Sequence, residues 1–346
     1  MPNQYINQIT ANFIPCLPTL GPSLQSAKDM LKLKQMGVQR VRQNCSHSTV
    51  EWHIETAKYV KDADLELLID LPGPKVRLEN VEAQTLEIGQ MITLGPDGMN
   101  VNTSLTGIPV GQMIKINDGI VKVEVLANNN GNLECKVTRS GPISDRKGLN
   151  FYGISLPIEN LTPKDKTLID AILPLYEVDW LAISFVQNAS DVLKLKEYII
   201  SKGFKVPKIC AKIETEEAIK NLDSIAKVVD SLMVARGDLA MENFKGECGV
   251  PFHQETIAKI AKANDKELIV ATEALASMLN NPIPTRAEVS DIFRTLVLNK
   301  ANFAMLSNET SVGKYPIECI KIIKRVYEIY LENQEMNKLD SFGFVG

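Results

Sequence analysis

The sequence has no surplus of positive charge, no apolar run long enough to cross a membrane and no paired cysteine spacing. Its 346 residues carry 38 Lys and Arg against 42 Asp and Glu, a net charge of −4, whereas nucleic-acid-binding domains are usually basic. The six cysteines are scattered without a CxxC pair, so we expect neither a disulfide framework nor a zinc site. The first residues lack a basic stretch followed by an apolar one. We therefore expect a cytoplasmic protein without signal peptide, membrane partner or nucleic-acid partner.

Short apolar runs alternate with amphipathic helical periods along most of the chain, as in α/β proteins. We predict strands at residues 13–20, 38–43, 65–70, 180–185, 207–213, 231–235, 266–272 and 302–306. We predict helices at residues 26–36, 49–61, 162–174, 189–201, 215–226, 251–263, 285–299 and 316–333. Eight such strand–helix units predict a (β/α)8 TIM barrel, whose active sites lie at the carboxyl ends of its strands.

Residues 72–150 have a different composition from the rest of the chain. They are rich in Gly and Asn, with short Ile and Val alternations between turn residues, which indicates a small all-β domain. We predict that residues 1–71 and 151–335 form the barrel, that residues 72–150 form a small β domain inserted after the third strand, and that residues 336–346 form a tail.

Charged and polar side chains gather at the predicted carboxyl ends of the strands. In chain order they are Arg42, Asn44, Ser46, His47, Asp70, Arg77, Ser184, Lys212, Glu214, Arg236, Asp238, Thr272, Glu273 and residues 307–310. A packed barrel interior does not need this ring of polar groups for stability. Because strand ends converge at one face of a barrel, the ring predicts a site for an anionic substrate and a metal.

The centre of this prediction is Lys212 with Glu214 and Asp238. Lys212 and Glu214 are two residues apart on a strand and therefore share a face. Glu214 and Asp238 are hard oxygen ligands for one divalent cation, beside the fixed charge of Lys212. Taken alone, the three residues fit a surface salt-bridge cluster equally well, and the other polar strand ends favour a site. The Gly237 and Asp238 amides are suited to a substrate carboxylate.

Other residues have structural explanations beside the functional ones. His47 near a strand end is more often a structural hydrogen-bonding group than a catalytic base, and Asp70 also suits a turn cap. The stretch PTRAE at residues 284–288 is a good helix start, and this role alone accounts for it.

Eleven stretches resemble the pyruvate kinase family, in the family's order, between about residues 13 and 320. They are TLGPS (19–23), VRQNCSH (41–47), DLPGPKVR (70–77), INDG (116–119), RKGLN (146–150), ISFV (183–186), KIE (212–214), MVARGDLA (233–240), ATEALASM (271–278), PTRAEVSD (284–291) and MLSNETSVGKYP (305–316). The resemblance implies a barrel whose inserted β domain, residues 72–150, closes as a lid, and its architecture agrees with the barrel and insert predicted from the residue patterns.

The resemblance also implies the chemistry, which is transfer of the phosphoryl group of phosphoenolpyruvate to ADP to give pyruvate and ATP. Glu214 and Asp238 would hold Mg²⁺ or Mn²⁺. Lys212 would neutralise charge on the phosphoryl group and enolate, Arg42 would bind the phosphoryl oxygens, and Thr272 would lie where the enolate is protonated. The residues implied for the rest of the substrate are Gly237, Asp238 and Ser184. Those implied for the nucleotide are Arg77, His47, Lys147 and Asn44.

Asn44, Ser46 and Asp70 match the pocket that binds K⁺ in many family members. Members that require K⁺ carry Glu where this chain has Lys75 and Thr where it has Leu71. The resemblance therefore implies that the Lys75 ammonium replaces K⁺, so we expect activity without K⁺.

The chain departs from the family pattern at Ala240, Glu273, Arg294 and Asn308. It also ends after the barrel, so the resemblance implies no C-terminal regulatory domain, no control by fructose bisphosphate, and a monomer or barrel-to-barrel homodimer. Two alternatives remain at this point. One is an enzyme of phosphoenolpyruvate or pyruvate-enolate chemistry with another acceptor, and the other is a non-catalytic binding or regulatory homologue.

Overall fold

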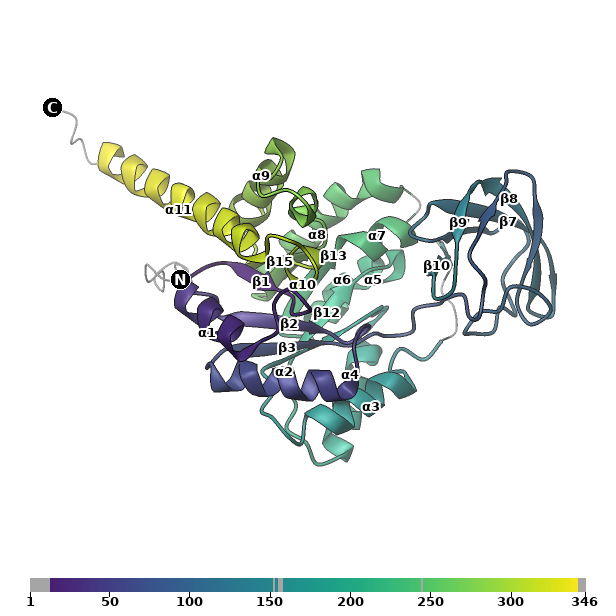
Figure 1. Ribbon diagram of the computed structural model, residues 1–346, viewed down its shortest axis with the longest axis horizontal. Helices are drawn as coiled ribbons and strands as arrows, with labels where there is room; N and C mark the ends of the chain where they lie inside the picture. The colour runs from purple at the N-terminus through teal and green to yellow at the C-terminus, as the bar shows by residue number, and fades with distance from the viewer. Residues whose placement is uncertain (1–12, 152, 155–157, 244, 342–346) are drawn as a thin grey trace.

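The computed structural model describes residues 13–151, 153–154, 158–243 and 245–341, and its larger part is a barrel of parallel strands (Figure 1). The strands are β1 (Cys16–Pro18), β2 (Arg40–Asn44), β3 (Glu66–Asp70), β11 (Trp180–Ile183), β12 (Lys208–Ile213), β13 (Ser231–Ala235), β14 (Glu267–Ala271) and β15 (Phe303–Leu306). They form one eight-stranded sheet in the order β1-β15-β14-β13-β12-β11-β3-β2. A parallel bridge between Thr19 and Arg42 joins its two edges. The predicted TIM barrel is confirmed.

Helices cover the outside of the barrel. They are α1 (Ala27–Met36), α2 (Val50–Asp62), α3 (Pro163–Ile172), α4 (Ala189–Ser201), α5 (Glu216–Lys220), α6 (Leu222–Ala226), α7 (Arg236–Glu242), α8 (Val250–Ala263), α9 (Arg286–Phe293), α10 (Asn308–Ser311) and α11 (Pro316–Ser341). Ser26, Thr162 and Thr285 each begin a helix with a capping box, which pairs backbone donors that the first turn leaves unsatisfied. The PTRAE stretch therefore has the structural role expected for it.

Several helical segments differ from the prediction. The predicted helix at residues 215–226 is two helices that meet at Asn221, whose side chain donates to the Gln187 carbonyl at 2.9 Å; asparagine competes with helical hydrogen bonding in this way. The predicted helix at residues 285–299 changes into a π-helical turn, Arg294–Leu298. Helix α7 was not predicted, because its seven residues are too few to show a helical period.

The barrel interior is apolar, and its amino-terminal end is closed by a buried arginine. The interior side chains are Leu17, Leu68, Trp180, Ala182, Cys210, Met233, Ile269, Ala271, Phe303 and Met305. Arg40 forms ion pairs with Glu66 at 2.7 Å and Glu267 at 2.6 Å, and its guanidinium lies 4.0 Å from the Trp180 ring centre. This end of a barrel serves stability. The carboxyl ends of the strands, at the opposite face of the barrel, are where we expect the active site.

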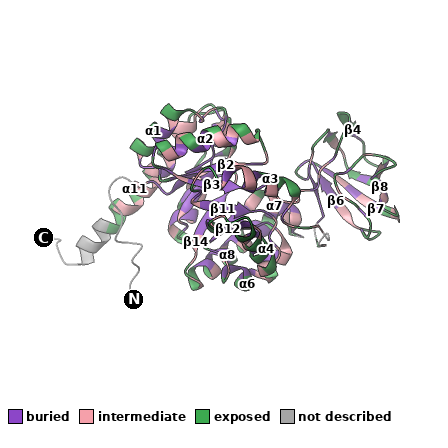
Figure 2. Ribbon diagram, turned by 90° about the horizontal axis from the view of Figure 1, so that it is seen from below, coloured by how far each residue is buried: buried purple, intermediate pink, exposed green. Residues whose placement is uncertain are grey.

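A second, all-β part projects from the barrel on the side opposite α11 (Figures 1 and 2). Its strands are β4 (Gln84–Leu86), β5 (Met91–Leu94), β6 (Met113–Ile116), β7 (Val121–Asn129), β8 (Asn132–Arg139), β9 (Gly141–Ile143) and β10 (Leu149–Asn150). They form an antiparallel five-stranded sheet, β10-β6-β7-β8-β5, and a two-stranded sheet, β4-β9. Their buried side chains make a hydrophobic cluster of their own, separate from that of the barrel. We call this part the small β part.

Helix α11 continues to Ser341, eight residues beyond the predicted end at residue 333. Residues 336–341 of the predicted tail are therefore helical, and residues 342–346 lie outside the described residues. No helix in the described part of the chain is long and apolar enough to cross a membrane.

Candidate active site

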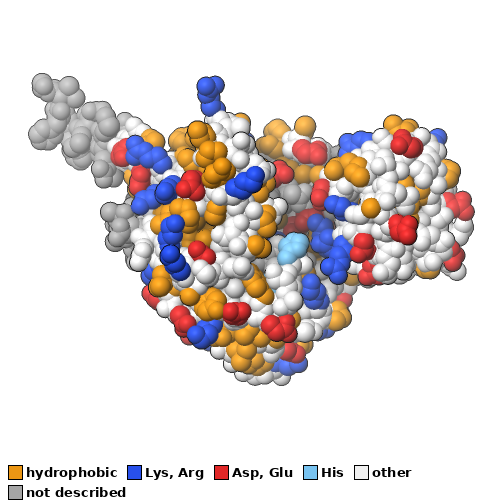
Figure 3. Space-filling model, viewed as in Figure 1, with side chains coloured by type: hydrophobic (Ala, Val, Ile, Leu, Met, Phe, Trp, Pro, Cys, Tyr) orange, Lys and Arg blue, Asp and Glu red, His pale blue; other side chains and the backbone are white. Residues whose placement is uncertain are grey.

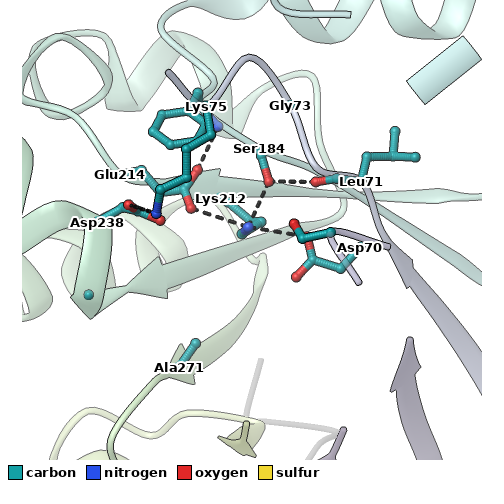
Figure 4. A network of polar contacts seen from close by, with 12 residues as sticks. Asp70, Leu71, Gly73, Lys75, Ser184, Lys212, Glu214, Asp238 and Ala271 are labelled. Atoms are coloured by element: carbon teal, nitrogen blue, oxygen red, sulfur yellow. Dashed lines mark hydrogen bonds and ion pairs between the residues drawn. The ribbon is translucent and has the colours of Figure 1, made fainter. Parts of the chain in front are cut away.

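Lys212 lies at the centre of a polar cluster at the carboxyl end of β12 (Figure 4). Its ammonium donates to Ser184 Oγ at 2.6 Å and lies 3.2 Å from both Asp70 Oδ1 and Glu214 Oε1. Ser184 in turn donates to the Leu71 carbonyl at 2.7 Å. The period of two predicted that Lys212 and Glu214 share a face, and the structure brings them together. The role of Ser184 in fixing the lysine was not predicted.

Asp70 connects Lys212 to Arg42. Arg42 Nε donates to Asp70 Oδ2 at 2.7 Å, and a terminal guanidinium nitrogen of Arg42 donates to Thr19 Oγ1 at 2.9 Å. Because both side chains are almost completely buried, the arginine is held in one orientation. Asp70 is therefore the counter-ion of two cations rather than a turn cap.

A further cation, Lys75, binds Asp238, the second of the two predicted metal ligands. Its Nζ donates to Asp238 Oδ1 at 2.7 Å, and this contact was not predicted. The loop reaches the site because Gly73, with φ +64°, packs on Ser184, where a Cβ atom would lie 2.7 Å from Ser184 Cβ. Only glycine fits such a close approach with this backbone conformation.

The burial of these groups shifts their pKa values. Burial acts most strongly against the charges of Lys212 and Asp70, but the attractions of their neighbours together outweigh it. Asp70 and Glu214 raise the pKa of Lys212, and Lys212 and Arg42 lower the pKa of Asp70. Burial likewise acts against Asp238, yet Lys75 and then Lys212 hold the pKa of Asp238 below its ordinary value. Burial raises the pKa of Glu214, and the Lys212 charge does not fully offset it. The site therefore contains fixed charges that remain ionised near neutral pH.

Glu214 and Asp238 fit a divalent cation by the chemistry of their donors. Both are carboxylates, and Mg²⁺ is usually bound by one or two carboxylates together with substrate oxygens and water. Glu214 Oε2 also accepts from the Phe185 amide at 2.6 Å, which fixes the carboxylate. No group of three or more His, Cys, Asp or Glu side chains suited to a metal occurs among the described residues. Two carboxylates would leave further coordination positions of such a cation open to other ligands.

Thr272 faces the first turn of α7 across the site. Its hydroxyl accepts from the Gly237 amide at 3.0 Å and donates to the Ala271 carbonyl at 2.7 Å. Its φ of +70° is unusual for a β-branched residue. Arg236 binds the carbonyls of Ala271 and Thr272 and the Asp291 carboxylate. Arg236 therefore supports the strained turn and does not point to a substrate.

A hollow with positive walls lies between the barrel and the small β part, next to Lys75 (Figure 3). Three cations, Lys75, Arg77 and Lys164, and one carboxylate, Glu159, line it, so that the lining has a net positive charge. Desolvation lowers the pKa of the nearby exposed residue His47, and the charges of Arg77, Arg42 and Lys164 lower it further. The hollow therefore carries positive potential, as an anion-binding site requires.

The remaining predicted residues lie around this hollow with mostly structural contacts. Asn44 Oδ1 accepts from the Ser46 amide at 3.1 Å, and the Lys147 carbonyl accepts from the Leu78 amide. In the described structure Lys75 forms its ion pair with Asp238 and not with Asp70, the one carboxylate of the predicted K⁺ pocket.

Comparisons with known proteins agree with this architecture. A family described as "Pyruvate kinase, barrel domain" matches residues 14–320. The chain belongs to the pyruvate kinase family. A pyruvate kinase of Thermotoga maritima is 37% identical over 328 residues, covering 89% of this chain and 69% of the relative. Pyruvate kinase 2 of Synechocystis sp. is 35% identical over 344 residues, covering 92% of this chain and 56% of the relative.

A solved structure gives the same result in three dimensions. The crystal structure of a pyruvate kinase from Cryptosporidium parvum has a TM-score of 0.84 at 29% sequence identity, and the match covers 91% of this chain and 68% of that one. The chain thus spans between about half and two thirds of the length of the curated relatives it matches.

The structure accommodates the departures from the family pattern. The Ala240 methyl group is buried against Met241 and Val250. Arg294 pairs with Glu255 at 3.0 Å. Asn308 is exposed at the start of α10. Glu273 is exposed and has a φ of +53°, which is a strained conformation for a glutamate.

Helix α7 also contacts the small β part. Asn150 Nδ2 donates to Glu242 Oε1 at 2.6 Å, and Lys115 Nζ donates to the carbonyls of Ala240 and Met241 at 3.1 and 2.8 Å. Burial raises the pKa of Glu242 to about 7, although the hydrogen bond from Asn150 acts against the shift. Sequence reasoning missed this interface. Asn150, a polar residue between the apolar Leu149 and Phe151, was a weak signal for it.

Proposed function

We propose that this site transfers the phosphoryl group of phosphoenolpyruvate to ADP, giving pyruvate and ATP. The observation that carries the proposal is Lys212, held by Asp70, Glu214 and Ser184 beside the predicted metal ligands. Phosphoryl transfer depends mainly on positioning and on fixed positive charge, with little covalent chemistry from the protein. A cluster built from charges rather than around a nucleophile is consistent with such a reaction.

Each residue of the cluster has a role in this proposal. The Arg42 guanidinium, held by Asp70 and Thr19, binds phosphoryl oxygens of the substrate. The Lys212 ammonium stabilises negative charge as the bond between phosphorus and the enol oxygen breaks and the ADP oxygen bonds to phosphorus. The enolate then takes a proton at its methylene carbon, on the face where we place Thr272. The Gly237 amide, ordered by Thr272, and Ser184 complete the substrate-binding side.

Glu214 and Asp238 would hold Mg²⁺ or Mn²⁺, which when bound would neutralise charge on the phosphoryl and carboxylate oxygens. We propose Arg77, His47, Lys147 and Asn44 for the nucleotide side. The positive walls of the neighbouring hollow support this placement. We further propose that residues 72–150 act as a lid, since their separate core allows movement as a unit that excludes water.

We also propose that the reaction does not require K⁺. Lys75 already brings an ammonium to the site, and it lines the same hollow as Ser46, one of the residues that match the family's K⁺ pocket. A tethered ammonium supplies the same single charge as the ion.

The test is pyruvate and ATP formation from phosphoenolpyruvate and ADP with Mg²⁺, in K⁺-free buffer and again with K⁺. Similar turnover in both buffers supports both phosphoryl transfer to ADP and independence from K⁺. Turnover only with K⁺ supports the kinase activity but contradicts the replacement of K⁺ by Lys75. No turnover, with phosphoenolpyruvate still bound, would overturn the kinase and favour another acceptor or a binding protein.

A further inference from the structure

The ion pair between Lys75 and Asp238 affects how tightly a divalent cation can bind. This inference rests on the metal site proposed above. The cluster contains three carboxylates, Asp70, Glu214 and Asp238, and three cations, Arg42, Lys75 and Lys212. Its charges therefore balance without a metal ion. A dication added to this cluster meets two carboxylates already neutralised by nearby cations.

Two of the three cations are firmly held. Lys212 has three partners, Asp70, Glu214 and Ser184, and its side chain is 13% exposed. Arg42 has two partners, Asp70 and Thr19, and its side chain is 7% exposed. Moving either one would leave the buried Asp70 with one counter-ion fewer, which is costly.

Lys75 is held much less firmly. Within the described structure its side chain hydrogen-bonds only to Asp238, and it is 21% exposed. It lines the hollow described above and also a second one, lined among others by Phe185 and Glu242, so its ammonium has room to move. The stem passes over Gly148, where an added Cβ would lie 3.1 Å from Lys75 Cε. Lysine has a long and flexible side chain, and Lys75 has a single hydrogen-bond partner and open space beside it. Of the three cations it is therefore the one that can leave its carboxylate.

We propose that Lys75 is a tethered competitor of the divalent cation for Asp238. The ammonium occupies the carboxylate in the metal-free protein, and metal binding exchanges it for the dication. Lys75 thereby weakens metal binding to the free protein. The released ammonium stays tethered beside the site, where an anionic substrate gives it a new partner.

The test measures Mn²⁺ binding alone, without substrate, by the electron paramagnetic resonance signal of unbound Mn²⁺. Lys75→Met should bind Mn²⁺ at least about tenfold more tightly than the wild type, because one fixed positive charge next to a ligand is removed. Lys164→Met is the matched control, since this exposed lysine lines the neighbouring hollow, and its Kd should stay within about twofold because solvent and salt screen its charge. Loss of structure would weaken binding, so tightening cannot come from misfolding.

The outcomes separate this proposal from the metal site itself. An equal or weaker affinity in Lys75→Met, with Mn²⁺ binding lost in Asp238→Asn, overturns the competition and leaves the metal site. No Mn²⁺ binding in any form, with or without phosphoenolpyruvate, overturns both. A second measurement uses the wild type alone. Mn²⁺ should increase acetylation of Lys75 by acetic anhydride, read by peptide mass spectrometry, and leave Lys164 unchanged, whereas equal labelling of Lys75 with and without Mn²⁺ contradicts the exchange.

Discussion

Arg42 and Asp70 form a buried ion pair, with Arg42 Nε 2.7 Å from Asp70 Oδ2 and the two side chains 7% and 1% exposed. Asp70 also lies 3.2 Å from the Lys212 ammonium. One carboxylate thus orients two cations that we assign to the transferring phosphoryl group. This relationship makes Asp70 important for both stability and activity.

Asp70→Asn is expected to lower the free energy of unfolding by about 3 to 5 kcal/mol, because it leaves buried cations without a countercharge. Urea unfolding measures the loss. Asp170→Asn is the control, since Asp170 pairs with Lys202 at 2.6 Å on the surface and such pairs contribute about 0 to 1 kcal/mol. Equal losses in the two variants would contradict a buried, structural role for Asp70.

Lys212→Met is expected to reduce kcat by about 10³-fold, because it removes a fixed charge aimed at the phosphoryl group and enolate. The coupled assay of pyruvate formation measures this. Lys208→Met removes an exposed lysine from the other end of the same strand and should leave kcat within about twofold. If Lys212→Met retained more than about a tenth of the wild-type kcat, Lys212 would not be the stabilising group.

Thr272→Ala is expected to lower kcat by about 10²-fold with a small change in KM, because the hydroxyl that orders Gly237 and faces the protonation step is lost. Thr272→Ser retains the hydroxyl and should recover most of the activity. A Ser variant as slow as the Ala variant would indicate that the methyl group and the strained turn matter, and not the hydroxyl.

Lys75→Glu is expected to make turnover depend on K⁺, because the tethered ammonium is replaced by the residue found in K⁺-requiring family members. Turnover is measured from zero to high K⁺ at constant ionic strength, with Lys164→Glu as a control of equal charge change. A wild type that already needs K⁺ would remove the basis of this prediction.

Glu242 is expected to make stability fall with pH between about 4.5 and 7. Its pKa is raised from 4.5 to about 7 by burial, so across this interval the folded state holds the proton more tightly than the unfolded state. The contribution to the free energy of unfolding is therefore complete below the lower value and is lost as pH rises through the upper one. Urea unfolding of Glu242→Gln should show a smaller decline over this window than the wild type, while the exposed control Glu197→Gln should follow the wild type. Identical slopes for all three proteins would exclude the shift.

Sequence reasoning reached the barrel because its signals are repeated and local. Strands such as β13 have the predicted ends, and cap residues such as Thr285 begin helices where expected. The same reasoning brought Lys212 and Glu214 together, since a period of two fixes neighbours on one strand.

The contacts that balance the charges of the site could not be predicted from the sequence. Lys75 and Asp238 are 163 residues apart, and their pairing depends on how the loop at Gly73 crosses Ser184. The contact between Asn150 and Glu242 likewise depends on where the small β part lies against the barrel. Such long-range pairs follow from tertiary packing, and no local pattern encodes them.

Helix α7 connects the proposed metal site mechanically to the small β part. Its first turn carries Asp238, and its last carbonyls and Glu242 are bound by Lys115 and Asn150 of the small β part. Seven residues rising about 1.5 Å each make a rigid strut about 10 Å long. A displacement of the small β part would therefore be transmitted through this helix to Asp238, which we propose as a metal ligand, and metal binding at Asp238 would in turn alter the contact between α7 and the small β part.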